Sequence, residues 1–276
     1  MKILFWILAF VITASVAVYQ RVTGPSYPIK GEISVHNEII NYNFNRSQEG
    51  QIDSKVNIPV KNKEISGILF WKRYNTEDDW SQTIMMRTGD TLFASLPAQP
   101  PAGKLEYFIR LSDGTEDYKL PPDESVIIRF KGEVPNFILY LHIIAMFGAM
   151  LLSTRTGFEF FSKEPKHVRL TIWTIGFLIA GGLILGPVIQ KYAFDAYWTG
   201  FPFGHDLTDN KTVVALLGWV IAFLMYKRSD HPKRWALFAS VLLIVVYLIP
   251  HSVLGSELDY DKIDKEKSSV EFLLNK

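Results

Sequence analysis

Long apolar runs fill the second half of the chain. Four of them occur between residues 135 and 252, and each approaches the roughly 20 helical residues that cross a bilayer core of about 30 Å. We therefore predict a bundle of membrane-spanning helices in residues 135–253. The predicted spans are residues 136–153, 170–189, 212–226 and 235–250.

A fifth apolar segment opens the chain at residues 3–19, directly after Lys2. Two interpretations remain open for residues 1–25: an uncleaved signal anchor, or a signal peptide with a cleavage site at the small residues Ser15 and Ala17. The anchor is favoured because the apolar run continues to Tyr19 without a polar break. The bundle therefore has four or five spans, and either interpretation exports the segment that follows.

Residues 26–134 show a different period. Ile40, Tyr42 and Phe44 alternate with asparagines, which is the pattern of a half-buried strand. The same alternation recurs at residues 56–60, 107–111 and 126–130. Turn signals rich in Gly, Pro and Asp separate these segments. About seven short strands in roughly 105 residues predict an all-β antiparallel sandwich.

Several motifs in this segment carry a resemblance. They are residues 70–74 (FWKRY), Trp80, residues 89–92 (GDTL), Leu96-Pro97 and residues 103–109 (GKLEYFI). They resemble bacterial immunoglobulin-like or fibronectin-type-III-like modules, which implies a β-sandwich but no particular activity. The whole chain is also similar to uncharacterised bacterial inner-membrane proteins that begin with elements like Tyr19-Gln20-Arg21 and Thr23-Gly24-Pro25. This second resemblance implies no function.

Basic residues in the short loops predict the orientation. The loop after the second apolar run carries Arg155, Lys163, Lys166 and Arg169, and residues 227–234 carry four more basic residues. Residues 190–211 contain only two lysines against three aspartates. Basic loops stay in the cytoplasm. We therefore expect a multi-pass inner-membrane protein whose sandwich and C-terminal polar tail, residues 254–276, are extracytoplasmic.

Composition and charge narrow the choice of partners. The chain has 276 residues, of which 48% are hydrophobic and 21% charged, and its net charge is +1. A chain without a basic stripe is not expected to bind nucleic acid. It has no cysteine, which excludes disulfides, thiolate zinc sites, iron–sulfur clusters and cysteine nucleophiles. The expected partners are the lipid bilayer and an envelope protein that binds the sandwich.

His142 is the leading candidate for chemistry inside the membrane. It lies seven residues after Pro135, or about 10 Å along a helix, and an ionisable residue inside a span is a functional hypothesis. Met146 and Met150 share its helical face, and this His-Met stripe suits copper. With His251, it would form an axial pair for haem b. The alternative is ordinary helix packing by the two methionines.

A wider set of residues predicts a site for a divalent metal or copper ion. Its members are imidazoles and carboxylates near the extracytoplasmic ends of the spans, namely His142, His205, Asp206, His251 and Glu257. Asp206 is available because Thr208 or Asp209 can cap the helix expected to begin near Thr212. No short spacing such as HExxH is present, so a solvated cluster at the helix ends is the alternative.

No catalytic motif of a hydrolase, nucleotide-binding enzyme or calcium-binding loop occurs in the sequence. We therefore expect a non-catalytic binding, sensing or assembly component of the cell envelope rather than an enzyme. The alternative is a redox or metal-handling membrane protein. The short connection at residues 131–135 predicts that the sandwich lies directly on the bundle. The tail is expected to be either a short amphipathic helix or disordered.

Overall fold

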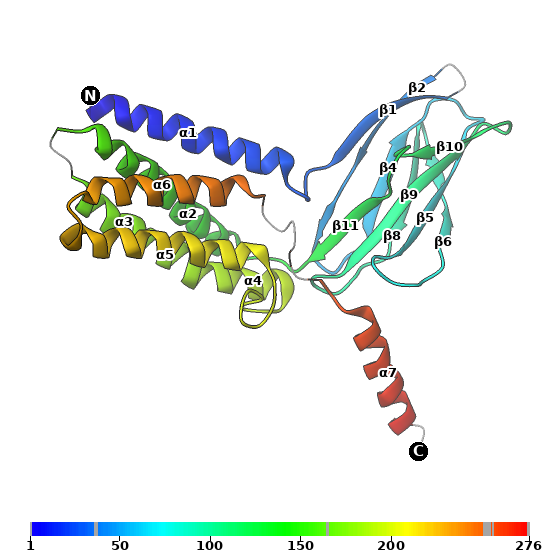
Figure 1. Ribbon diagram of the computed structural model, residues 1–276. Coiled ribbons are helices and arrows are strands. Elements are labelled where there is room, and N and C mark those ends of the chain that lie inside the picture. The colour runs from blue at the N-terminus through cyan, green and yellow to red at the C-terminus, as the bar shows by residue number, and fades with distance from the viewer. Residues whose placement is uncertain (1, 36–37, 164–165, 251–254, 256, 275–276) are drawn as a thin grey trace. The chain divides into compact units, whose positions relative to one another are not determined.

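The computed structural model describes residues 2–35, 38–163, 166–250, 255 and 257–274. The chain divides into two compact units (Figure 1). The helical unit comprises Met1–Pro25 and Val134–Ser256, and the β unit comprises Ser26–Glu133 and Glu257–Lys276.

The helical unit contains six α-helices among the described residues, and a π-helical segment joins two of them. They are α1 (Lys2–Thr23), α2 (Asn136–Gly157) with the 3₁₀ turn η1 (Phe158–Phe161), α3 (His167–Leu178), the π-helix η2 (Ile179–Leu185), α4 (Gly186–Phe194), α5 (Leu207–Arg228) and α6 (Pro232–Leu248). The segments α3, η2 and α4 form one continuous helix of 28 residues.

Four helices in the described part of the chain are long and apolar enough to cross a membrane. They are Lys2–Thr23, Asn136–Phe161, His167–Phe194 and Leu207–Arg228. Four of the five predicted apolar segments therefore correspond to helices of spanning length. The fifth, predicted at residues 235–250, corresponds to α6, which is shorter at 17 residues.

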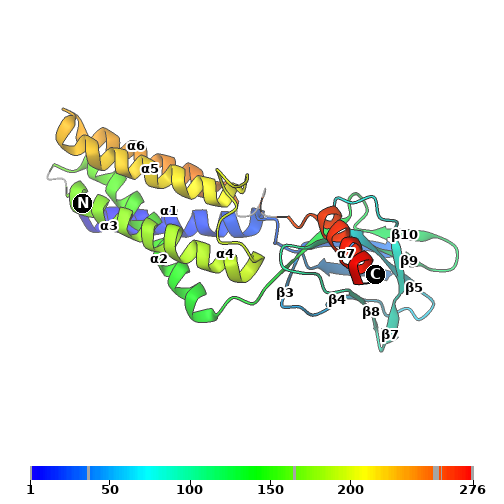
Figure 2. The ribbon, with the colours of Figure 1, turned by 90° about the horizontal axis from the view of Figure 1, so that it is seen from below.

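Helix α6 packs against α5 (Figure 2) and also against α2, and α1 packs against α2 and α6. Small residues allow these close approaches: a Cβ atom on Gly157 would lie 2.5 Å from Ser240 Oγ, and one on Gly218 would lie 2.7 Å from Leu242. The core of the unit contains the fully buried Trp219, together with Ala149 and Leu243.

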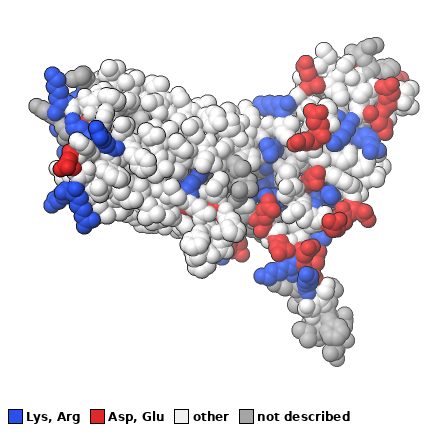
Figure 3. Space-filling view, in the orientation of Figure 1, with Lys and Arg blue, Asp and Glu red and all other residues white. Residues whose placement is uncertain are grey.

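Apolar side chains also cover the outside of the helical unit, in contrast to a soluble bundle. The exposed ones include Phe10, Ile144, Trp173, Ile184, Leu217, Phe238 and Val245. In Figure 3 the middle of this unit is nearly free of charged side chains, and Lys and Arg gather at one end. We call this the basic end; it includes Lys2, Lys163, Arg169, Lys227, Arg228, Lys233 and Arg234. The opposite end, where Thr23, Asn136, Phe194, Leu207 and Leu248 lie, is called the linker end.

The β unit contains eleven strands among its described residues. They are β1 (Ile29–Val35), β2 (Glu38–Phe44), β3 (Ser47–Glu49), β4 (Ser54–Pro59), β5 (Ser66–Arg73), β6 (Ser81–Ile84), β7 (Met86–Thr88), β8 (Thr91–Leu96), β9 (Lys104–Ser112), β10 (Asp117–Leu120) and β11 (Val126–Lys131). They form a two-stranded sheet β1-β2, a six-stranded sheet β3-β11-β9-β5-β6 with β10 beside β9, and a three-stranded sheet β4-β8-β7. Pairing is antiparallel except between β3 and β11, which are parallel.

Alternating side chains of all three sheets meet in one core. Along β9 the residues Leu105, Tyr107, Ile109 and Leu111 are buried, while those between them are not. The same core includes Phe44 of β2, Ile58 of β4, Leu69 of β5 and Leu92 of β8, among others. The period of two read in the sequence therefore identified the inward-facing positions of β2, β4, β9 and β11.

The C-terminal segment belongs to the β unit and includes the helix α7 (Tyr260–Leu274). Leu258 N donates to Ala102 O at 3.3 Å, and Arg73 forms an ion pair with Asp264 at 2.7 Å. Of the two interpretations of this tail, the structure has the helix.

Candidate functional site at the linker end of the helical unit

Polar side chains from five helical segments gather at the linker end, although the helices around them are apolar. Each lies in or next to the first or last turns of its helix. They are Gln20 of α1, His142 of α2, Gln190 of α4, Asp206, Asp209 and Lys211 at the start of α5, and Tyr247 of α6. Polar groups in a membrane span are costly unless they are satisfied or used in function. Their hydrogen bonds therefore decide which of them are structural.

His142 is held by the π-helix. Its Nδ1 lies 3.0 Å from the carbonyl oxygen of Gly181. A carbonyl can only accept, so Nδ1 carries the hydrogen and Nε2 is left with its lone pair in the neutral ring. The glycines of this segment allow close packing: a Cβ on Gly182 would lie 2.4 Å from Thr212, and one on Gly181 would lie 2.7 Å from Met146. These contacts bring His142, Met146 and the start of α5 into one neighbourhood.

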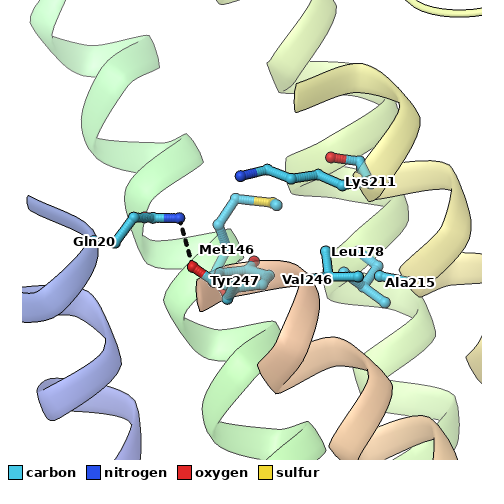
Figure 4. A pocket seen from close by; sticks show the side chains of 8 residues that line it. Gln20, Met146, Leu178, Lys211, Ala215, Val246 and Tyr247 are labelled. Carbon is cyan, nitrogen blue, oxygen red and sulfur yellow. Dashed lines mark hydrogen bonds between the residues drawn. The ribbon is translucent and has the colours of Figure 1, made fainter. Parts of the chain in front are cut away.

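Lys211 lines a pocket next to Met146 and the start of α5. Its residue surface is only 6% exposed, and its Nζ donates to the carbonyl oxygen of Ile249 at 2.7 Å. The pocket is lined by Gln20, Met146, Leu178, Lys211, Thr212, Ala215, Val246 and Tyr247 (Figure 4). In Figure 4 the Lys211 side chain extends from α5 toward Gln20 of α1. The ammonium of this buried side chain is thus directed into a space lined by five helices, α1, α2, α3, α5 and α6.

Two further hydrogen bonds close the walls of this pocket. Gln20 Nε2 donates to Tyr247 O at 3.0 Å, and the Tyr247 hydroxyl donates to Met146 O at 3.1 Å. Together with Lys211, Gln20 therefore satisfies carbonyls at the C-terminal end of α6, which lack partners within the helix. These bonds join α6 to α1, α2 and α5.

The loop between α4 and α5 is closed by carboxylates. Asp209 accepts hydrogen bonds from Thr199 N at 2.8 Å, Gly200 N at 2.9 Å and Gln190 Nε2 at 3.2 Å. Asp206 is the N-cap of α5 and accepts from Thr208 N at 2.7 Å. The expectation that Asp206 is not needed as a cap was wrong, because α5 begins at Leu207 rather than near Thr212. The polar first turn of the helix looks like a loop when only hydropathy is considered.

The residues predicted to bind a metal lie in different environments. His142 and Asp206 have the partners given above, and His205 is exposed. Glu257 belongs to the β unit, where it pairs with Lys104. His251 lies outside the described residues. The described residues contain no group of three or more His, Asp or Glu that could hold a metal ion. Any site that includes His251 therefore stays a prediction.

The basic end contains a buried ion pair that sequence reasoning missed. Arg155 Nη1 lies 2.6 Å from Glu159 Oε1, and their side chains are 5% and 3% exposed. Glu159 also accepts from Lys166 N at 2.7 Å, and the rings of Phe5 and Trp6 lie over the guanidinium at 5.5 and 5.4 Å. Arg155 had been counted as a loop residue. The available signal was the i,i+4 spacing from Arg155 to Glu159.

His167, also at the basic end, is buried although it follows a basic stretch of sequence. The residue is 8% exposed and its ring contacts Tyr226 edge to face at 5.3 Å. It begins α3, and its burial follows from the packing of α3 against α5. The basic residues around it in the sequence therefore gave no indication that this position is buried.

Charged and aromatic groups also fix the C-terminal segment to the β unit. Arg73 donates to both carboxylate oxygens of Asp78, at 2.6 and 2.8 Å, which lowers the pKa of Asp78. The Tyr260 hydroxyl donates to Gln99 Oε1 at 3.0 Å and accepts from Lys104 N at 3.1 Å, and burial raises its pKa to about 12. Burial also lowers the pKa of Lys104, although its partner Glu257 opposes this effect.

Comparison with models of known protein families and with curated protein sequences finds no match for this chain. The functional proposal therefore rests on the geometry of the residues described above.

Proposed function

We propose that this protein is a non-catalytic binding, sensing or assembly component of the bacterial cell envelope. Its helical unit lies in the inner membrane, and its β unit, including the C-terminal segment, lies on the extracytoplasmic side. One observation carries the proposal: the helical unit exposes apolar side chains around its middle and collects Lys and Arg at a single end. A basic end of this kind is typical of the cytoplasmic side.

The proposal includes an immunoglobulin-like sandwich for the β unit. Its support is the single core shared by side chains of all three sheets, with buried and exposed positions alternating along β4, β8 and β9. Such a module offers sheet edges and loops as binding surfaces. A partner protein of the envelope is the occupant we propose.

The proposal also keeps α1 as an uncleaved anchor. Ala9, Thr13 and Val16 are buried, and Gln20 bonds to α6. The rings of Phe5 and Trp6 over Arg155 add cation–π contacts. Removing the first 17 residues would uncover the faces of α2 and α6 against which α1 packs, and it would take the two aromatic rings away from Arg155.

Short connections support a role in sensing or assembly. Helix α1 ends at Thr23 and β1 begins at Ile29, while β11 ends at Lys131 and α2 begins at Asn136. A few residues cannot absorb a large displacement. Binding of a partner to the β unit therefore acts directly on the ends of α1 and α2.

The absence of native cysteine permits a direct test of the orientation. Glu64→Cys places a thiol on the β unit and Asp230→Cys places one at the basic end; both residues are exposed. With a membrane-impermeant maleimide on spheroplasts, we expect labelling of Glu64→Cys and no labelling of Asp230→Cys until the cells are lysed. The parent chain is the unlabelled control. Labelling of Asp230→Cys alone in intact spheroplasts would reverse the proposed orientation.

The second candidate function is haem or metal binding, favoured by the orientation of His142. The hydrogen bond from Nδ1 to Gly181 O fixes the orientation of the imidazole ring and leaves the lone pair of Nε2 available as a ligand. Metal-binding histidines in proteins are oriented by this kind of hydrogen bond. If this function holds, the protein purified in detergent shows a Soret band or a stoichiometric metal, and His142→Ala loses it. His205→Ala distinguishes the two possible ligand sets. It leaves a haem pair of His142 and His251 intact, but it removes a ligand from a metal site that uses His205. A colourless, metal-free protein contradicts this candidate.

A further inference from the structure

A loop rich in aromatic residues joins α4 to α5 at the linker end (Figure 1). We call residues 196–204 the aromatic loop. Its Phe201 and Phe203 are 77% and 82% exposed. We propose that the aromatic loop is an interfacial anchor, which inserts these two rings into the extracytoplasmic leaflet of the bilayer. The inference rests on the membrane placement proposed above and adds the surface that this loop contacts.

The backbone of the aromatic loop has its donors paired within the helical unit. Every residue from Thr199 to Gly204 that carries an N–H donates it, and Pro202 carries none. The bonds, all of 2.7–3.0 Å, run from Thr199 N and Gly200 N to Asp209 Oδ2, from Phe201 N to Asn210 Oδ1, and from Phe203 N and Gly204 N to Gly200 O. Lipid tails offer no hydrogen bonds, so a segment enters a bilayer at low cost only if its polar groups are satisfied. The N–H groups of the aromatic loop meet this requirement.

The side chains of the aromatic loop suit a lipid surface better than a protein partner. Residues 196–204 (AYWTGFPFG) include no charged side chain. Trp198 Nε1 donates to Phe201 O at 3.1 Å, so the one donor of the indole is also used. A protein partner is recognised by polar groups around an apolar centre, whereas the membrane interface attracts aromatic rings without directional contacts. The bilayer is therefore the occupant that we infer.

Close contacts hold the aromatic loop in one shape against the start of α5. A Cβ atom on Gly200 would lie 2.6 Å from the Cβ of Asp209, and one on Gly204 would overlap the carbonyl oxygen of Thr199. Asp206 N donates to that same oxygen at 3.0 Å and closes the loop. The two phenylalanine rings are thus presented by a backbone that is already ordered, so their insertion costs little further conformational entropy.

The aromatic loop also lies next to surfaces that face lipid under the proposed placement. The helices that it joins, His167–Phe194 and Leu207–Arg228, are both long and apolar enough to cross a membrane. Ile184 and Tyr192 before the loop and Val214 after it are exposed. Val214 lies seven residues after the first residue of α5, or about 10 Å along the helix. Exposed apolar side chains therefore run along both helices toward the loop, which falls at the boundary between hydrocarbon and headgroups.

The chain has no cysteine, so single-cysteine variants of the full-length protein can carry a fluorophore at chosen positions. Phe203→Cys is labelled with an environment-sensitive fluorophore and reconstituted into phosphatidylcholine vesicles. Asp230→Cys carries the same fluorophore at the exposed basic end and corrects for the affinity of the fluorophore itself for lipid. With iodide on both sides of the membrane, we expect the label at position 203 to emit at shorter wavelength and to be quenched several-fold less than the label at position 230.

Lipids that carry a nitroxide near the headgroup or deep in the acyl chain measure the depth. Leu217→Cys is the reference, because Leu217 is exposed and lies ten residues, or about 15 Å, along α5. We expect the shallow nitroxide to quench the label at position 203 more strongly and the deep one to quench the label at position 217 more strongly. Phe201→Cys, which replaces a second exposed ring, should behave like Phe203→Cys.

Three outcomes would overturn the anchor. Strong iodide quenching at positions 201 and 203, together with lipid quenching at position 217, would place the loop in water and leave the membrane placement intact. Protection of positions 201 and 203 from both iodide and nitroxide lipids would show that protein covers the rings. Lipid quenching at none of the three positions would remove the membrane placement itself, and the anchor with it.

Discussion

Replacing Glu159 with alanine is expected to lower the free energy of unfolding of the helical unit by about 3–5 kcal/mol. The substitution removes the carboxylate that pairs with Arg155 and accepts from Lys166 N. It leaves a guanidinium that is almost entirely shielded from solvent and has lost its counter-charge. Hydrogen exchange measured by mass spectrometry on α2 and α3 peptides reports the loss for this unit separately.

The exposed pair Lys191–Asp195 is the matched control, because it has the same i,i+4 spacing and the same 2.6 Å distance. Asp195→Asn should change the free energy by no more than about 1 kcal/mol, since exposed pairs contribute little and asparagine tolerates the left-handed backbone (φ 60°) of this position. Replacing Arg155 and Glu159 together with methionine should recover much of the loss, because no buried charge is then left alone. A Glu159→Ala effect as small as that of Asp195→Asn would contradict the buried pair.

Hydropathy located the helices but not their ends. The run at residues 136–153 is the apolar part of α2, which continues to Gly157 and then η1. Likewise α5 begins at Leu207, five residues before the expected start. In both cases the terminal turns are polar in sequence, and their charged groups find partners nearby in the chain: Glu159 for Arg155, and Thr199 and Gly200 for Asp209. Hydropathy alone does not register such polar pairings.

Alternation located β2, β4, β9 and β11, but it did not identify β1, β5 or β8, and it missed the short strands. Strands β3 and β7 have three residues each, and β6 and β10 have four, too few for a period of two to stand out. The parallel pair β3–β11 joins residues about 80 positions apart and has no local signal. Antiparallel pairing was confirmed for the other neighbours in the three sheets.

The candidate site was predictable in part. His142 stood out because it is ionisable within an apolar run, but its partner Gly181 depends on the π-helix η2. Lys211 was counted among the loop lysines. It had a signal of its own, since an apolar run begins directly after Thr212 and a lysine there falls within the first turns of the helix. Its burial depends on α1 and α6, which no local pattern places beside it.

Phe44→Ala is the second substitution with a large expected effect, about 3–5 kcal/mol on the free energy of unfolding of the β unit. Phe44 of β2 is 1% exposed, stacks on Tyr42 with ring centroids 5.0 Å apart and meets the Tyr107 ring of β9 edge to face at 6.0 Å. Its truncation opens a cavity where the two-stranded and six-stranded sheets share their core. Hydrogen exchange of β9 peptides measures the loss.

Ile39→Ala is the matched control, because Ile39 lies on the same strand but is 66% exposed. It should change the free energy by no more than about 0.5 kcal/mol, as surface substitutions do. The Phe44→Ala effect must also extend beyond β2: if β1 and β2 were a separate ribbon, only their own amides would lose protection. Faster exchange in β9 together with β2 would show that one cooperative core joins the sheets, whereas a loss confined to β1 and β2 would contradict the shared core and, with it, the proposed sandwich.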